Sequence, residues 1–127
     1  MRSIEDTLAH YAACVTAKDI DGIVGLYADD ASIEIPVGGR VHRGIAAIRA
    51  FYTNNELAQN LEIAGRACVA GREAAVPMRA RIARDGKLFE LDVIDVAAVD
   101  EQGRLTLLRA FFDLAGARPL HEGFARS

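Results

Sequence analysis

The chain has 127 residues, of which 51% are hydrophobic and 26% charged, and its formal net charge is −3 at pH 7. This length and composition fit one globular domain with a sizeable core. Interspersed charges argue against a nucleic-acid-binding face, and no apolar run is long enough to span a membrane. Because the N-terminus lacks the apolar segment of a signal peptide, we expect a cytoplasmic protein.

Three helices are predicted within the first 55 residues, each with one apolar face. The first begins after Ser3, which has Asp6 three residues on, as in a capping box. The second covers residues 20–28 after Asp19, and the third covers residues 44–55. The residues that share the apolar faces are Ile4, Leu8, Tyr11 and Val15, then Ile20, Ile23, Val24 and Tyr27, then Ile45, Ile48 and Tyr52.

After Leu57, alternating apolar and polar residues predict an antiparallel meander. Turn signals at Gly71-Arg72, Asp85-Gly86 and residues 100–103 separate its strands. Helices followed by a meander make an α+β domain. If the sheet curls around the helices, it encloses a pocket. We expect this single domain to cover residues 1–114, followed by a loose tail over residues 115–127.

In the predicted strand over residues 87–99, Asp95 is the one ionisable residue among the odd-numbered positions from 89 to 99. A carboxylate on an apolar face is costly when ionised, so we expect the pKa of Asp95 to be raised. The neutral acid would then donate a hydrogen bond. A salt bridge with Arg109 on a neighbouring strand is the alternative. The other residues of this face are Phe89, Leu91, Val93, Ala97 and Val99.

The three tyrosines of the chain fall one on each predicted helix, and each lies on the inward face. A buried phenol usually needs a hydrogen-bond partner. Tyr11, Tyr27 and Tyr52 could therefore form a chain of hydroxyl groups, or they could be three separate core residues.

These features resemble the bacterial ketosteroid isomerases of the nuclear-transport-factor-2-like superfamily, from about residue 5 to residue 113. The segments "DIDGIVGLYADDASIEIP", "FYTNN" and "LDVIDVAAVDEQGRL" carry the resemblance. "YADDA" occurs across the superfamily, whereas its combination with Tyr11 and "DVIDV" is more specific to the isomerases. The resemblance implies a cone-shaped fold, with three N-terminal helices packed in a strongly curved mixed sheet, usually dimeric through that sheet.

The resemblance also implies an oxyanion hole. Tyr11 and a protonated Asp95 would bind the steroid oxygen as it gains enolate charge, and Tyr52 and Tyr27 would extend the hydrogen-bond chain. The general base of the family is an aspartate directly before the proline of the first strand. Ile35 stands at that position here, and an isoleucine cannot accept a proton.

Two residues near Ile35 could supply a base instead. Strand alternation points Glu34 away from a pocket that Ile35 lines, although a bulge near Pro36 could turn it inward. His42, beyond the Gly38-Gly39 turn, is the other candidate. The residues expected to shape the pocket, besides Ile35, are Val37, Met78, Leu108 and Phe112.

We therefore expect an isomerase-type enzyme for a steroid or a similar flat, apolar enone, with activity weakened or altered by Ile35. A non-catalytic binding protein for such ligands is one alternative. A dehydratase, cyclase or epoxide hydrolase on the same fold is another.

No cofactor or metal is expected, because His10, His42 and His121 lack ligand spacing. Cys14 and Cys68 are expected to be buried free thiols. Apolar residues on both faces of the strands between residues 73 and 113 predict a homodimer.

Overall fold

The computed structural model describes residues 3–120 as an eight-stranded sheet with three α-helices and one short 3-10 helix. The helices are α1 (Ile4–Ala17), α2 (Ile20–Val24), α3 (Ile45–Asn54) and η1 (Leu114–Gly116). The strands are β1 (Tyr27–Glu34), β2 (Val41–Arg43), β3 (Asn60–Ile63), β4 (Cys68–Ala70), β5 (Glu73–Arg84), β6 (Lys87–Val99), β7 (Leu105–Phe111) and β8 (Arg118–Pro119).

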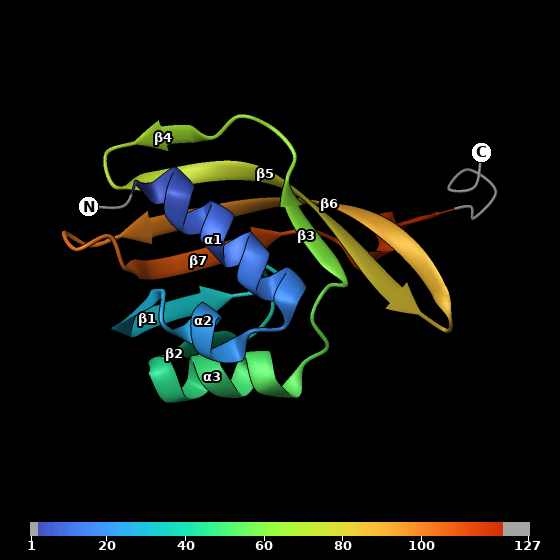
Figure 1. Cartoon of the computed structure of the whole chain (residues 1–127), viewed down its shortest axis with the longest axis horizontal. Coiled ribbons are helices and arrows are strands. Elements are labelled where there is room, and N and C mark those ends of the chain that lie inside the picture. Colours follow the sequence, from blue (N-terminus) through green and yellow to red (C-terminus); the bar gives the residue numbers. More distant parts are fainter. Residues whose placement is uncertain (1–2, 121–127) are drawn as a thin grey trace.

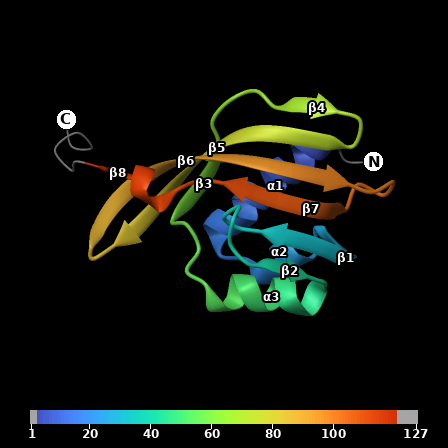
Figure 2. The ribbon, with the colours of Figure 1, turned by 180° about the vertical axis from the view of Figure 1, so that it is seen from behind.

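The sheet is mixed and strongly curved. Its strand order is β2-β1-β7-β6-β5-β3, with β4 also pairing with β5 and β8 with β6. β1 and β7 run parallel, and the other strand pairs are antiparallel. The three α-helices lie on one side of the sheet, and in the view from behind the strands lie in front of α1 and α2 (Figures 1 and 2). The predicted α+β cone is confirmed.

Capping begins the first two helices where the sequence predicts. The Ser3 hydroxyl accepts a hydrogen bond from the Asp6 N–H at 3.0 Å, and the Asp19 carboxylate accepts one from the Gly22 N–H at 2.9 Å. The prediction that the second helix continues to residue 28 is wrong. It ends at Val24, because Tyr27 already pairs with β7 and extends β1.

The Asp85-Gly86 turn fixes the register of the two longest strands. Both residues have positive φ angles, 52° and 76°, as a two-residue hairpin turn of type I′ requires. The β5–β6 pairing then continues without a bulge, so that Asp95 lies opposite Val76. Because side chains alternate along a strand, this register points Asp95 toward the helices.

The C-terminal segment is more ordered than predicted. Residues 112–117 leave the sheet and form η1, and β8 then pairs with β6 through Arg118 and Glu90. The loose tail expected from residue 115 is therefore wrong for residues 115–120, which are held by η1, by the β6–β8 pairs and by the hydrogen bond from the Leu120 N–H to the Leu88 carbonyl. The rest of that predicted tail, residues 121–127, lies outside the described residues.

Apolar side chains also gather on the face that the helices leave uncovered. Ile94 of β6 and Phe111 of β7 are paired neighbours there and are 41% and 39% exposed. Cys14 is buried as predicted, whereas Cys68 is exposed, because β4 pairs with β5 alone and lies at the sheet margin. None of the helices described between residues 3 and 120 is long and apolar enough to cross a membrane.

Candidate active site

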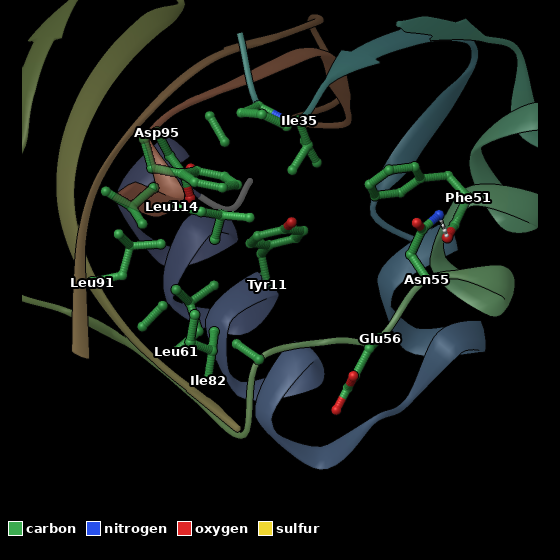
Figure 3. A pocket seen from close by; sticks show the side chains of 16 residues that line it. Tyr11, Ile35, Phe51, Asn55, Glu56, Leu61, Ile82, Leu91, Asp95 and Leu114 are labelled. Carbon is green, nitrogen blue, oxygen red and sulfur yellow. Dashed lines mark hydrogen bonds between the residues drawn. The ribbon is translucent and has the colours of Figure 1, made fainter. Parts of the chain in front are cut away.

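A pocket of about 330 Å³ lies between α1, α3 and the inner face of the sheet. Its walls are mostly apolar, with Leu91 and Val93 of β6 among them. Figure 3 shows Tyr11 near the centre of the lining side chains, with Asp95 to one side and Asn55 to the other. An apolar cavity with a few polar groups is typical of a small-molecule site.

Asp95 is only 2% exposed, and no group in the described part of the chain donates a hydrogen bond to its carboxyl. Its neighbours across the sheet are Val76 of β5 and Ala110 of β7, which provide no charge. Burial therefore raises the pKa of Asp95 from its ordinary value to about 7. The direction agrees with the prediction, and below pH 7 the protonated acid predominates.

The alternative of a salt bridge between Asp95 and Arg109 is wrong. Arg109 follows Leu108 and precedes Ala110 on β7, so its side chain lies on the outer face of the sheet. There its Nε donates a hydrogen bond to Glu34 Oε1 at 2.9 Å, and its guanidinium lies 5.2 Å from the centre of the Phe111 ring.

The three tyrosines form one chain of hydroxyl groups, as predicted. Tyr52 Oη lies 2.9 Å from Tyr11 Oη and 2.8 Å from Tyr27 Oη. All three residues are buried, and desolvation raises their pKa values above the ordinary value, so the phenols stay protonated. Tyr11 lines the pocket, whereas Tyr27 and Tyr52 lie behind it.

This arrangement places two potential hydrogen-bond donors in one pocket. If Tyr27 donates to Tyr52 and Tyr52 donates to Tyr11, the Tyr11 proton is left to point into the pocket. The protonated Asp95 carboxyl is the second donor in the same pocket. Donors held in an apolar, water-poor cavity stabilise negative charge on an oxygen strongly.

Ile35 lines the pocket, and Glu34 does not. The Glu34 carboxylate accepts hydrogen bonds from the Gly38 N–H at 3.0 Å and from Arg109, and these two donors lower the pKa of Glu34. Glu34 therefore holds the turn after β1 in place from the outer side. This corrects its assignment as a candidate base, since strand alternation decides its direction and no bulge at Pro36 turns it inward.

The other predicted site residues divide into two groups. Phe112 lines the pocket, as expected. Met78 and Leu108 do not, because each is 1% exposed and packs in the core instead. Val37 is also outside the lining, since its N–H is bonded to the Ala110 carbonyl at the end of β1. His42 stacks on Phe51 with a ring separation of 5.1 Å and does not reach the cavity.

Several lining residues were missed from the sequence. Leu91 and Val93 could have been found, because they share the strand face of Asp95. Phe51, Asn55 and Leu114 depend on how α3 and η1 turn toward the cavity, for which the sequence carries no local signal. Within residues 3–120, no group of three or more His, Cys, Asp and Glu side chains could hold a metal ion.

Comparisons of sequence and of structure relate this chain to a known domain family and to proteins described as enzymes. Residues 8–108 match the SnoaL-like domain. The steroid Delta-isomerase of Nocardioides simplex is 34% identical over 110 residues, which cover 86% of this chain and 89% of that protein. A solved structure of SalBIII, described as an epoxide hydrolase/cyclase-like enzyme with a role in pyran ring formation in the polyether salinomycin, has a TM-score of 0.81 and 25% identity, covering 92% of this chain and 95% of that chain.

The raised pKa of Asp95 predicts a pH dependence of stability. Between about pH 4 and pH 7 the unfolded chain has released this proton and the folded chain retains it, so the free energy of unfolding should fall as pH rises. The full effect is on the order of 4 kcal/mol. Asp95→Asn removes this contribution. Urea denaturation of both proteins from pH 4 to pH 8 should show a difference that grows with pH, and parallel stability curves would contradict the assignment.

Proposed function

The chain belongs to the SnoaL-like domain family, and from this membership we propose that it binds a steroid, or a similarly flat and apolar carbonyl compound or phenol, through Tyr11 and Asp95. One observation carries the proposal. A nearly fully buried carboxyl, with no hydrogen-bond partner among the described residues, shares an apolar pocket with the end of a buried tyrosine chain. Buried polar groups are normally satisfied, so a ligand oxygen is the partner that this site lacks.

The proposed reaction is a slow isomerisation of an enone. Moving a proton from C4 to C6 of a Δ5-3-ketosteroid passes through a dienolate whose negative charge lies largely on the C3 oxygen. Tyr11 and protonated Asp95 would stabilise that charge. The proton itself needs a base within hydrogen-bonding distance of C4, and Ile35 supplies none. The chain therefore has the electrophilic half of an isomerase site without the usual base.

A second candidate is an acid-catalysed reaction in the same pocket. A carboxylic acid with a pKa of about 7 can donate its proton to an oxygen that leaves carbon, as in the opening of an epoxide or the loss of water. The missing base is less damaging to such a reaction, and SalBIII is described as epoxide hydrolase/cyclase-like. A role in ligand binding without turnover would use the same two donors.

We also propose that the chain is a homodimer through the uncovered face of the sheet. Ile94 and Phe111 are exposed neighbours there, and the half-buried Val96 and Leu107 lie further along the same face, next to Arg109. Exposed apolar residues gathered on one face mark an interaction surface more often than a free one.

Binding of a phenolic steroid should depend on both donors. Estradiol titrated into the wild-type protein should bind, and Tyr11→Phe or Asp95→Ala should each weaken the affinity. Loss of one hydrogen bond to a charged oxygen costs about 1.5–3 kcal/mol, which is roughly a 10–100-fold rise in Kd. Tyr27→Phe, which changes the far end of the tyrosine chain, should have a smaller effect. Unchanged binding in both donor variants would show that the oxygen lies elsewhere.

Restoring a carboxylate at residue 35 should restore fast isomerisation. Wild-type turnover of a Δ5-3-ketosteroid should be slow, and Ile35→Asp should raise kcat by about 10²–10⁴-fold, the usual contribution of a positioned base. Val37→Asp adds a carboxylate outside the pocket lining and should leave the rate unchanged. Fast wild-type turnover that Glu34→Gln abolishes would instead identify Glu34 as the base, contrary to its position in the structure.

Sedimentation velocity tests the proposed dimer. At micromolar concentration the wild-type chain should sediment as a dimer, and Ile94→Asp should sediment as a monomer, because the new carboxylate would be buried at the interface. Leu88→Asp, which changes an equally exposed leucine near the β5–β6 turn, is the matched control. A monomeric wild-type protein would refute this assembly.

A further inference from the structure

The segment between β7 and β8 crosses the edge of the pocket. β7 and β6 pair as far as Phe111 and Ile94, and pairing resumes between Arg118 and Glu90. Residues 112–117 therefore lie opposite residues 91–93, which is a shorter stretch of β6. The excess chain leaves the sheet plane as η1. We call residues 112–119 the strap.

The strap forms part of the pocket wall beside Asp95. Phe112 follows Ala110, the cross-strand neighbour of Asp95, by two residues and points to the same side of the sheet. Phe112 and Leu114 both line the cavity, and Figure 3 shows Leu114 on the side of the pocket that Asp95 occupies. Leu114 is nevertheless 48% exposed. One side chain thus contacts the cavity and bulk water.

A forked arginine holds the far end of the strap to the outer face of β6. Arg118 donates hydrogen bonds to both carboxylate oxygens of Asp92, each at 3.1 Å, and to Glu90 at 3.2 Å. Within the strap, the Asp113 carboxylate accepts a hydrogen bond from the Ala115 N–H at 3.0 Å and so caps the start of η1. A bidentate arginine–carboxylate pair fixes geometry better than a single exposed ion pair does.

We propose that Arg118 is a positioning residue for the active site, because its fork to Asp92 and Glu90 keeps the strap closed and so keeps water away from Asp95. This inference rests on the proposed function for the identity of the ligand. Its physical basis is independent of the ligand, since it concerns only the access of water to one carboxyl. Opening the strap would hydrate Asp95 and let a bound ligand leave faster.

The sign of the expected change separates hydration from simple electrostatics. The titratable groups on the side of Asp95 are Tyr11 of α1, with Tyr27 and Tyr52 behind it, and Glu56, which lines the same pocket after α3, while β5 and β7 present uncharged residues. Removing the Arg118 charge leaves Asp92 without its ion-pair partner, while Glu90 keeps Arg79, and by charge alone this would raise the pKa of Asp95. Admitting water would lower it toward the ordinary aspartate value.

The test measures Asp95 directly by NMR titration of its carboxyl carbon in the full chain. In Arg118→Ala we expect the pKa of Asp95 to fall below the wild-type value and the dissociation rate of estradiol to rise several-fold. Arg118→Lys keeps the charge but loses the fork, so its Asp95 pKa and its estradiol dissociation rate should lie between those of the wild type and Arg118→Ala. Arg104→Ala removes another exposed, ion-paired arginine at the β6–β7 turn and should leave both quantities unchanged.

Leu114→Ser provides a second route that leaves the arginine fork intact. It opens the wall itself, so it should lower the pKa of Asp95 and speed estradiol release even if Arg118→Ala does not fold. An unchanged or raised Asp95 pKa in Leu114→Ser, or in a folded Arg118→Ala, overturns the inference. Failure of the wild-type protein to bind estradiol would count against the proposed function instead, because the NMR titration requires no ligand.

Discussion

The burial of one carboxyl group on an apolar strand face is the constraint around which the site is organised. Among residues 3–120, Asp95 has no hydrogen-bond donor and no cation beside it, so its charged form loses hydration without compensation. The neighbouring tyrosine chain fits the same condition, because protonated phenols add donors and no charge. The apolar walls then strengthen the hydrogen bonds that these donors make to a ligand, because electrostatic interactions are screened less where there is little water.

On the outer face of the sheet, in contrast, the carboxylates are paired with arginines. There Glu34 pairs with Arg109, and Arg118 pairs with Asp92 and Glu90, so these carboxylates have cationic partners and are partly exposed to solvent. Strand alternation separates the two faces: on β6, Asp92 faces outward and Asp95 faces inward. The same alternation explains why an acid at residue 34 cannot replace one at residue 35. Under the proposed function, the base that the reaction needs at residue 35 is therefore not supplied by Glu34.

The elements that sequence reasoning predicts well are those with a local cause. Capping at Ser3 and Asp19, the positive-φ turn at Asp85-Gly86 and the lone acid on the face of β6 are each written in a few adjacent residues. The end of the second helix and the formation of η1 depend instead on pairing between strands far apart in the sequence. Parallel pairing with β7 ended the second helix early, and the excess of chain opposite residues 91–93 made η1. Met78 and Leu108 pack in the core. Their apolar character alone does not show whether they line the pocket or lie in the core.

Under the proposed function, Tyr11 and Asp95 together donate hydrogen bonds to one ligand oxygen in an otherwise apolar pocket. A crystal structure of the wild-type chain with estradiol would test this by direct observation. We expect the phenol oxygen within about 2.5–3.0 Å of both Tyr11 Oη and an Asp95 carboxyl oxygen. The steroid rings should lie against Ile35 and Phe112. A phenol at the mouth beside Asn55 and Glu56, with Asp95 left unpartnered, would contradict the account.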